Sequence, residues 1–143
     1  MKLDRAHIKQ LVPHAGDMCL LHAVIDWSPT HIVCHAPQPD ARHPLARADA
    51  LPAIVAAEYA AQATAVHGAM LDNSAAPREG MLASLTGVEL YAPFFPAQGG
   101  PLTVNAQLLS RADSGCLYSF EVSDTRQAIA AGRLVVAFAR QAS

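Results

Sequence analysis

The chain has 143 residues, of which 52% are hydrophobic and 15% charged, and its formal net charge at neutral pH is −2. This length suits a single domain, and the absence of a basic cluster argues against nucleic acid and anionic membranes as partners. No uncharged stretch is free enough of Pro and Gly to span a bilayer, so we expect a second subunit to cover the surplus apolar surface.

Three cysteines, Cys19, Cys34 and Cys116, are scattered along the chain, and none belongs to a CxxC motif. An odd and dispersed set favours reduced, apolar filling residues over disulfides or a metal site. The first residues are charged and lack the apolar run of a signal peptide. We therefore expect a soluble, cytoplasmic protein without a metal ion.

In chain order, the pattern first predicts a short helix over residues 4–11 and a turn at 13–17. Alternating apolar residues over 18–36, interrupted at Ser28-Pro29, predict a hairpin. The polar, proline-containing stretch 37–49 is a predicted loop that contains His43. Residues 51–70 are rich in alanine and form the strongest predicted helix, with Asp49 as its cap and Pro52 in its first turn.

After this helix the hydrophobic pattern changes to period two and predicts four strands, over residues 81–91, 102–109, 116–123 and 126–139. Short connections between neighbouring strands favour an antiparallel sheet. A sheet of this size beside one apolar helix predicts an α+β domain over residues 1–143. In that domain about five to six strands curl around the helix.

One carboxylate interrupts the apolar surface of the predicted long helix. On a helical wheel, Glu58 and Gln62 fall within the arc of the apolar residues, and residues 51–70 contain no Lys, Arg or Asp. An enclosed carboxylate has a raised pKa or a partner, and a carboxylic acid near neutrality suits a general acid. The alternative is that Glu58 reaches solvent or pairs with an arginine such as Arg47.

Three features stand at fixed intervals along the same helix: Pro52, Glu58 and Ala61-Gln62. They resemble the central helix of the short bacterial β-hydroxyacyl-ACP dehydratases, which has Pro-Gly at its start, an acidic residue after it and then Ala-Gln. The segments 11–14 with 18–21, and 89–102, are similar to the opening and to the strand–turn–strand of that family. The sequences of residues 13–21 and 58–63 most resemble a predicted branch of this family that is associated with aryl-polyene-type pathways.

The resemblance implies a hotdog fold that dehydrates 3-hydroxyacyl thioesters to trans-2-enoyl thioesters. The substrate would be carried on the phosphopantetheine of acyl carrier protein, or on CoA, with no other cofactor. His43, the histidine of the loop before the helix, would remove the α-proton, and Glu58 would protonate the departing hydroxyl. The thioester oxygen would lie near the Ala53 amide at the positive end of the helix dipole.

In hotdog dimers the loop histidine and the helix carboxylate of one site come from different subunits, so the resemblance implies a homodimer, a heterodimer or a higher oligomer. Two departures separate this chain from the family. First, the family's His-Phe-Pro-Gly is here His43-Pro44-Leu45-Ala46, and the histidine lies one residue further from Pro52. Second, the glycine that follows the helix-start proline in the family is here Ala53. They motivate a non-catalytic subunit that completes a heterodimeric dehydratase. A hotdog thioesterase, which needs no loop histidine, is a further alternative.

The remaining polar candidates have more ordinary readings. Gln62 is expected to orient Glu58 or the thioester, or to satisfy a backbone group in the core. His14, in a predicted turn, either makes a structural hydrogen bond or contributes to substrate binding. His31 and His35 share one side of a strand without a third ligand, which argues against a metal site. His67 is expected to bind carbonyl groups at the end of the helix.

Overall fold

The computed structural model describes residues 3–11, 18–72 and 80–138. In these residues a 3₁₀ turn, two helices and seven strands follow one another. Their bounds are β1 (Leu3–Asp4), α1 (Arg5–Leu11), β2 (Ala23–Ser28), β3 (His31–Ala36), η2 (Ala53–Val55), α2 (Ala56–Asp72), β4 (Gly80–Leu90), β5 (Leu102–Ala112), β6 (Gly115–Ser123) and β7 (Ala128–Phe138).

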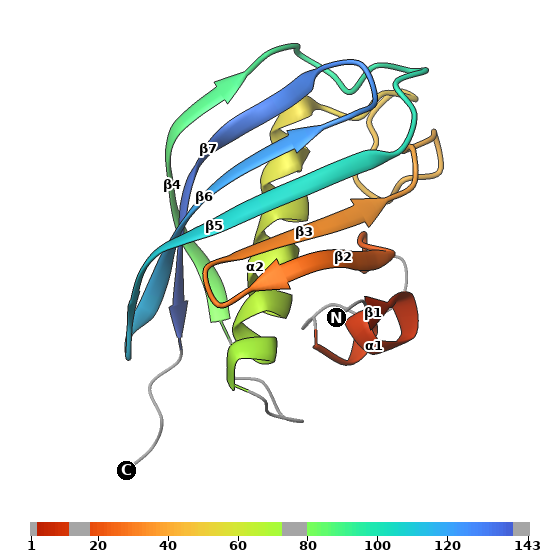
Figure 1. Cartoon of the computed structure of the whole chain (residues 1–143). Helices are drawn as coiled ribbons and strands as arrows, with labels where there is room; N and C mark the ends of the chain where they lie inside the picture. The colour runs from red at the N-terminus through yellow and green to blue at the C-terminus, as the bar shows by residue number, and fades with distance from the viewer. Residues whose placement is uncertain (1–2, 12–17, 73–79, 139–143) are drawn as a thin grey trace.

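The seven strands form a single antiparallel sheet in the order β1-β2-β3-β5-β6-β7-β4. The sheet curls around α2, which runs across its concave face (Figure 1). This confirms the predicted α+β hotdog architecture. The bounds of the last four strands differ from the predicted ones by at most three residues, whereas α2 begins five residues after the predicted helix start, with η2 just before it. The seventh strand is the two-residue β1, which pairs with β2 just before the predicted first helix.

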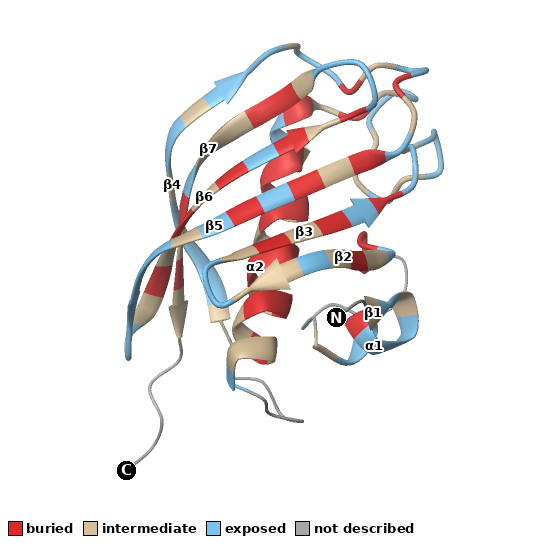
Figure 2. Cartoon of the chain, in the orientation of Figure 1, coloured by how far each residue is buried: buried red, intermediate tan, exposed pale blue. Residues whose placement is uncertain are grey.

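Buried residues alternate with less buried ones along the central strands (Figure 2). In β5, Val104 and Ala106 are buried against the helix side, whereas Asn105 and Gln107 are exposed. Most of α2 is buried, and much of its buried surface is alanine, which lets the helix lie close to the sheet. The less covered stripe of the helix contains Glu58, with Ile54 and Ala61 near it.

The start of the helix differs from the predicted cap. Pro52 is the N-cap residue of η2, and no side chain caps it. Asp49, the predicted cap, lies earlier, where Ala48 and Asp49 both have positive φ angles of 49° and 66°. The backbone instead closes this end: Ala53 N–H donates to Pro93 O at 2.9 Å, and Phe95 N–H donates to Leu51 O at 2.9 Å. Packing with a distant segment therefore replaces a local cap.

Strand β4 is an edge of the sheet, because it pairs with β7 alone. Its ladder has two irregularities, one between Leu82 and Ser84 and the other between Thr86 and Glu89. Apolar side chains lie exposed along it and just beyond it, with Met81 at 70% exposure, Leu82 at 40%, Leu90 at 46% and Tyr91 at 53%. In a single chain this edge thus offers both unpaired backbone groups and apolar surface.

All three cysteines are buried and free, as predicted. Burial raises the pKa of the Cys34 thiol to about 12, so it is a thiol rather than a thiolate at neutral pH. None of the helices within the described residues is both long and apolar enough to cross a bilayer.

Candidate active site

His43 lies in the loop between β3 and η2, as predicted, and its ring points back to the central helix. Its Nε2 atom lies 3.1 Å from the hydroxyl of Tyr59, and the Leu45 N–H donates to its Nδ1 atom at 3.1 Å. The backbone amide requires Nδ1 to be unprotonated, so the hydrogen of the neutral ring sits on Nε2. His43 Nε2–H is therefore the donor, and the Tyr59 oxygen is the acceptor.

The His43 side chain is half-buried. Burial lowers the pKa of His43 below its usual value, and the negative charge of Asp40 opposes this with a smaller upward effect. The ring is accordingly neutral at pH 7, which is the protonation state that a general base requires.

Tyr59 was not singled out from the sequence, although it follows Glu58 directly. Its side chain is only 2% exposed, and its ring packs against Phe95 with a centroid distance of 5.9 Å. Burial also raises its pKa, so the hydroxyl stays protonated. The available signal was a large aromatic residue within a run of alanines, because such a side chain must fill space that its small neighbours leave open.

Gln62 connects the helix to the segment before β2. Its amide nitrogen donates to Met18 O at 2.6 Å and to Glu58 Oε1 at 3.2 Å, while its oxygen accepts the Leu20 N–H at 2.9 Å. Gln62 therefore contacts Glu58 and also satisfies backbone groups in the core, while its role toward a thioester stays a prediction. Glu58 itself is half-buried in the single chain, rather than enclosed by it.

The Ala53 amide, which was predicted to face the thioester oxygen, already has an acceptor within the chain. Its N–H donates to Pro93 O at 2.9 Å, and Val55 N–H donates to Pro52 O at 3.0 Å. The first amides of a helix lack intrahelical acceptors, and the remaining one here is that of Ile54, for which no acceptor is found among the described residues.

Two further histidines were considered in the sequence, His14 and His31. His14 lies outside the described residues. His31 is held by Asp26 and Ser28, with Nε2 3.1 Å from Asp26 Oδ2 and Nδ1 2.6 Å from Ser28 Oγ. Within the described residues, no group of three His, Cys, Asp or Glu side chains could hold a metal ion.

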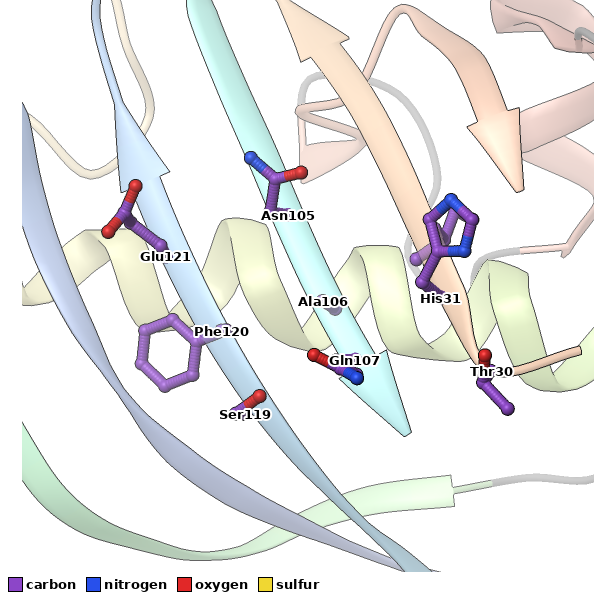
Figure 3. A pocket seen from close by; sticks show the side chains of 9 residues that line it. Thr30, His31, Asn105, Ala106, Gln107, Ser119, Phe120 and Glu121 are labelled. Atoms are coloured by element: carbon purple, nitrogen blue, oxygen red, sulfur yellow. The ribbon is translucent and has the colours of Figure 1, made fainter. Parts of the chain in front are cut away.

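A hollow of about 490 Å³ lies elsewhere, on the outer face of the sheet. Figure 3 shows its lining side chains on three neighbouring strands, with the helix behind them. Its exposed polar residues are Thr30, Asn105, Gln107 and Glu121, and the half-buried His31 lies beside them. The hollow is thus separated by the sheet from His43 and Glu58, which belong to the helix side.

Comparison with solved structures places the chain beside hotdog proteins. The dehydratase heterocomplex ApeI:P from Xenorhabdus doucetiae matches with a TM-score of 0.80 and 27% identity, over 94% of this chain and 91% of that chain. An HP0420 homologue from Helicobacter felis matches with a TM-score of 0.62 and 14% identity, over 94% and 90% of the two chains.

A hypothetical thioesterase with coenzyme A, from Streptococcus pneumoniae, matches with a TM-score of 0.59 and 9% identity, over 84% of this chain and 87% of that chain. At this identity the likeness concerns the fold alone, as it does for the Helicobacter protein. A search of curated proteins finds no match. The family model described as ApeP-like, ApeP dehydratase, matches residues 6–143. The chain therefore belongs to the ApeP-like dehydratase family.

Proposed function

We propose that this chain takes part in the dehydration of 3-hydroxyacyl thioesters to trans-2-enoyl thioesters, with the acyl group carried on phosphopantetheine of acyl carrier protein or on CoA. The observation that carries the proposal is the position of His43 in a member of a dehydratase family. A neutral loop imidazole is held against the helix residue that follows Glu58. His43 and Glu58 are the two proton-transfer groups that the proposed reaction needs.

In the proposed reaction, His43 removes the proton from the α-carbon, and the resulting enolate expels the 3-hydroxyl group. Glu58 supplies the proton that turns the departing hydroxide into water. Successive helix residues point about 100° apart, so Glu58 and Tyr59 leave α2 in different directions. A complete site then combines His43 of one subunit with the carboxylate of another, as the family resemblance implies.

The thioester oxygen gains negative charge in this step and needs a donor. We place it at the start of η2, where the Ile54 N–H and the positive end of the helix dipole favour an anion. One donor of this kind contributes about 3 kcal/mol to an oxyanion transition state. Gln62, bonded to Glu58, would hold the carboxyl group in place.

A second hotdog subunit is part of the proposal. The unpaired edge of β4 and its exposed apolar residues suit pairing with another sheet. The match to the Xenorhabdus heterocomplex favours an ApeI-type subunit as that partner. The cost of exposing this edge in a single chain is then removed by association. Met81→Lys would place a charge in the apolar contact and weaken it.

A non-catalytic role within such a heterocomplex is the second candidate. One observation favours it, because both ring nitrogens of His43 already have partners inside the chain. In that case the histidine of the partner would act together with Glu58 of this chain, and His43 would serve only to fix its own loop.

The test measures reversible hydration of crotonyl-ACP and crotonyl-pantetheine by the loss of enoyl absorbance, for the chain alone and with an ApeI-type subunit. We expect activity in at least one of these preparations, reduced about 100-fold or more in His43→Ala and in Glu58→Gln. His31→Ala is the matched histidine control and keeps full activity.

The outcomes separate the candidates. If the complex loses activity in Glu58→Gln but keeps it in His43→Ala, then His43 is not catalytic and the second candidate function is favoured. Release of free thiol instead of hydration would identify a thioesterase. A fully assembled complex without hydration would contradict the dehydratase proposal.

A further inference from the structure

The hydrogen bonds of His43 leave it without a free lone pair. Leu45 N–H donates to Nδ1, and the hydrogen on Nε2 points to the Tyr59 hydroxyl oxygen. A general base must direct a lone pair at the proton that it removes. The ring in this arrangement is therefore a hydrogen-bond donor to its own chain, even though its neutral state suits a base.

Of the two partners in this bond, Tyr59 is the fixed one. Its ring is buried on α2 and packs against Phe95, whose N–H in turn bonds Leu51 O at 2.9 Å. The rings of Tyr59 and His43 lie 6.0 Å apart and are tilted by 39°, so the hydroxyl contact rather than ring stacking joins them.

The segment that carries His43 is built to change more easily. Between β3 and η2 the chain forms no strand or helix. It is held by the isolated bridges Arg47–Ala50 and Pro52–Phe94 and by turn hydrogen bonds at His43, whose neighbours Asp40, Arg42 and Pro44 are exposed. Ala48 and Asp49 both adopt left-handed backbone conformations, which are costly for residues other than glycine. Movement of His43 shifts a half-buried side chain with exposed neighbours, whereas movement of the buried Tyr59 would open the core.

We propose that Tyr59 holds His43 in a resting form, and that the substrate must displace the Tyr59–His43 hydrogen bond before His43 can act. The inference rests on the proposed dehydratase function and adds a positioning residue to it. Once the ring leaves Tyr59 and Leu45, it can exchange its hydrogen with water and present an unprotonated nitrogen to the α-carbon. The bond stabilises the free protein and opposes the first step of the reaction.

Imidazole ¹⁵N spectra of the histidine-labelled chain test the resting form without any need for activity. We expect His43 Nδ1 to be unprotonated and Nε2 to carry a slowly exchanging hydrogen. In Tyr59→Phe, which keeps the ring but lacks the hydroxyl, that hydrogen should exchange rapidly. Saturation of the wild-type protein with crotonyl-pantetheine should have the same effect.

The kinetic arm compares kcat/KM of the most active preparation. Loss of one neutral hydrogen bond from the resting state should raise kcat/KM of Tyr59→Phe by about two- to tenfold. Tyr118→Phe is the matched control, because it removes the hydroxyl of the other tyrosine that contacts a histidine. It should lower the melting temperature and leave kcat/KM within about twofold.

A hydrogen on Nδ1 in the wild type, or a fall in kcat/KM of Tyr59→Phe comparable with that of His43→Ala, would overturn the inference. If no preparation shows hydration, the proposed function fails. The ¹⁵N spectra still decide whether a thioester displaces the hydrogen bond between His43 and Tyr59. Displacement of the His43–Tyr59 bond by crotonyl-pantetheine would then support the inference, and persistence of the bond would refute it.

Discussion

Two histidine–tyrosine pairs lie at opposite ends of the central helix, and their hydrogen bonds run in opposite directions. At the start of α2, His43 from the loop donates to Tyr59 of the helix. Further along, His67 of the helix lies 2.7 Å from the Tyr118 hydroxyl of β6, and its other nitrogen lies 2.8 Å from Ser28 O. The carbonyl can only accept, so His67 Nε2 carries the hydrogen and Nδ1 accepts from Tyr118.

The pairs differ in what surrounds them. The His67 side chain is 0% exposed and stands edge-on to Tyr118, and both of its partners belong to the sheet. His43 is half-buried and belongs to a loop. A histidine–tyrosine hydrogen bond therefore serves the fold where every partner is fixed, as at His67. At His43, where the loop partner can move away, breaking the bond would free the imidazole for proton transfer.

The largest expected effect on stability is that of His67→Ala. It opens a cavity and leaves Tyr118 and Ser28 O without their buried partner, so we expect a loss of about 3 kcal/mol or more in the free energy of unfolding. Denaturant unfolding measures this. His43→Ala should cost less than about 1 kcal/mol, since its site is open to water. Equal losses would remove the distinction between the two pairs.

Gly99→Ala tests the loop that holds the helix start. A Cβ at Gly99 would lie 2.0 Å from Asp124 Oδ2, an oxygen that is buried and without a hydrogen-bond partner within the described residues. Asp124 is held by the amides of Arg126 and Gln127, so it cannot easily give way. We expect a loss of about 1–3 kcal/mol, measured by denaturant unfolding. An unchanged unfolding midpoint would show that the loop adapts.

The pH dependence of stability should reflect the buried pair. Burial lowers the pKa of His67 in the folded state, and lowers those of His43 and His22 in the same direction. Below about pH 6.5 the unfolded chain therefore binds more protons than the folded one, and stability falls as the pH is lowered. Unfolding measured between about pH 7 and 5 should show this fall, with a shallower slope in His67→Gln. The same slope in both proteins would assign it to other groups.

The smallest expected effect comes from Gly68→Ala, beside His67 on the less covered stripe of α2. A Cβ there would meet no atom within 4 Å, and glycine inside a helix is unfavourable. We expect a gain of about 0.5–1 kcal/mol in the free energy of unfolding. Thermal unfolding of the single chain measures it. A loss of stability instead would indicate that another part of the protein packs against Gly68 and has no space for the added methyl group.

Local patterns predicted the elements well because their causes are local. The run of alanines identified α2, and period-two alternation identified β5 and β6. What the sequence could not provide were contacts between distant segments. The bond of the Ala53 amide to Pro93 joins residues forty positions apart, and His67 was expected to bind helix carbonyls but instead contacts Ser28 at the end of β2 and Tyr118 of β6. Tyr59 was missed for the same reason, because only the fold brings it to His43.

The segment after β4 ties the edge of the sheet to the start of the helix. Tyr91 N–H bonds Ile129 O, and Pro93 and Phe95 exchange backbone hydrogen bonds with Ala53 and Leu51. A subunit that pairs with β4 and shifts this segment would also shift the helix terminus beside His43. Thermodynamic linkage is reciprocal, so whatever factor assembly contributes to ligand affinity, the ligand must return to assembly. The change in thioester affinity on assembly and the change in partner affinity on thioester binding then measure the same coupling free energy.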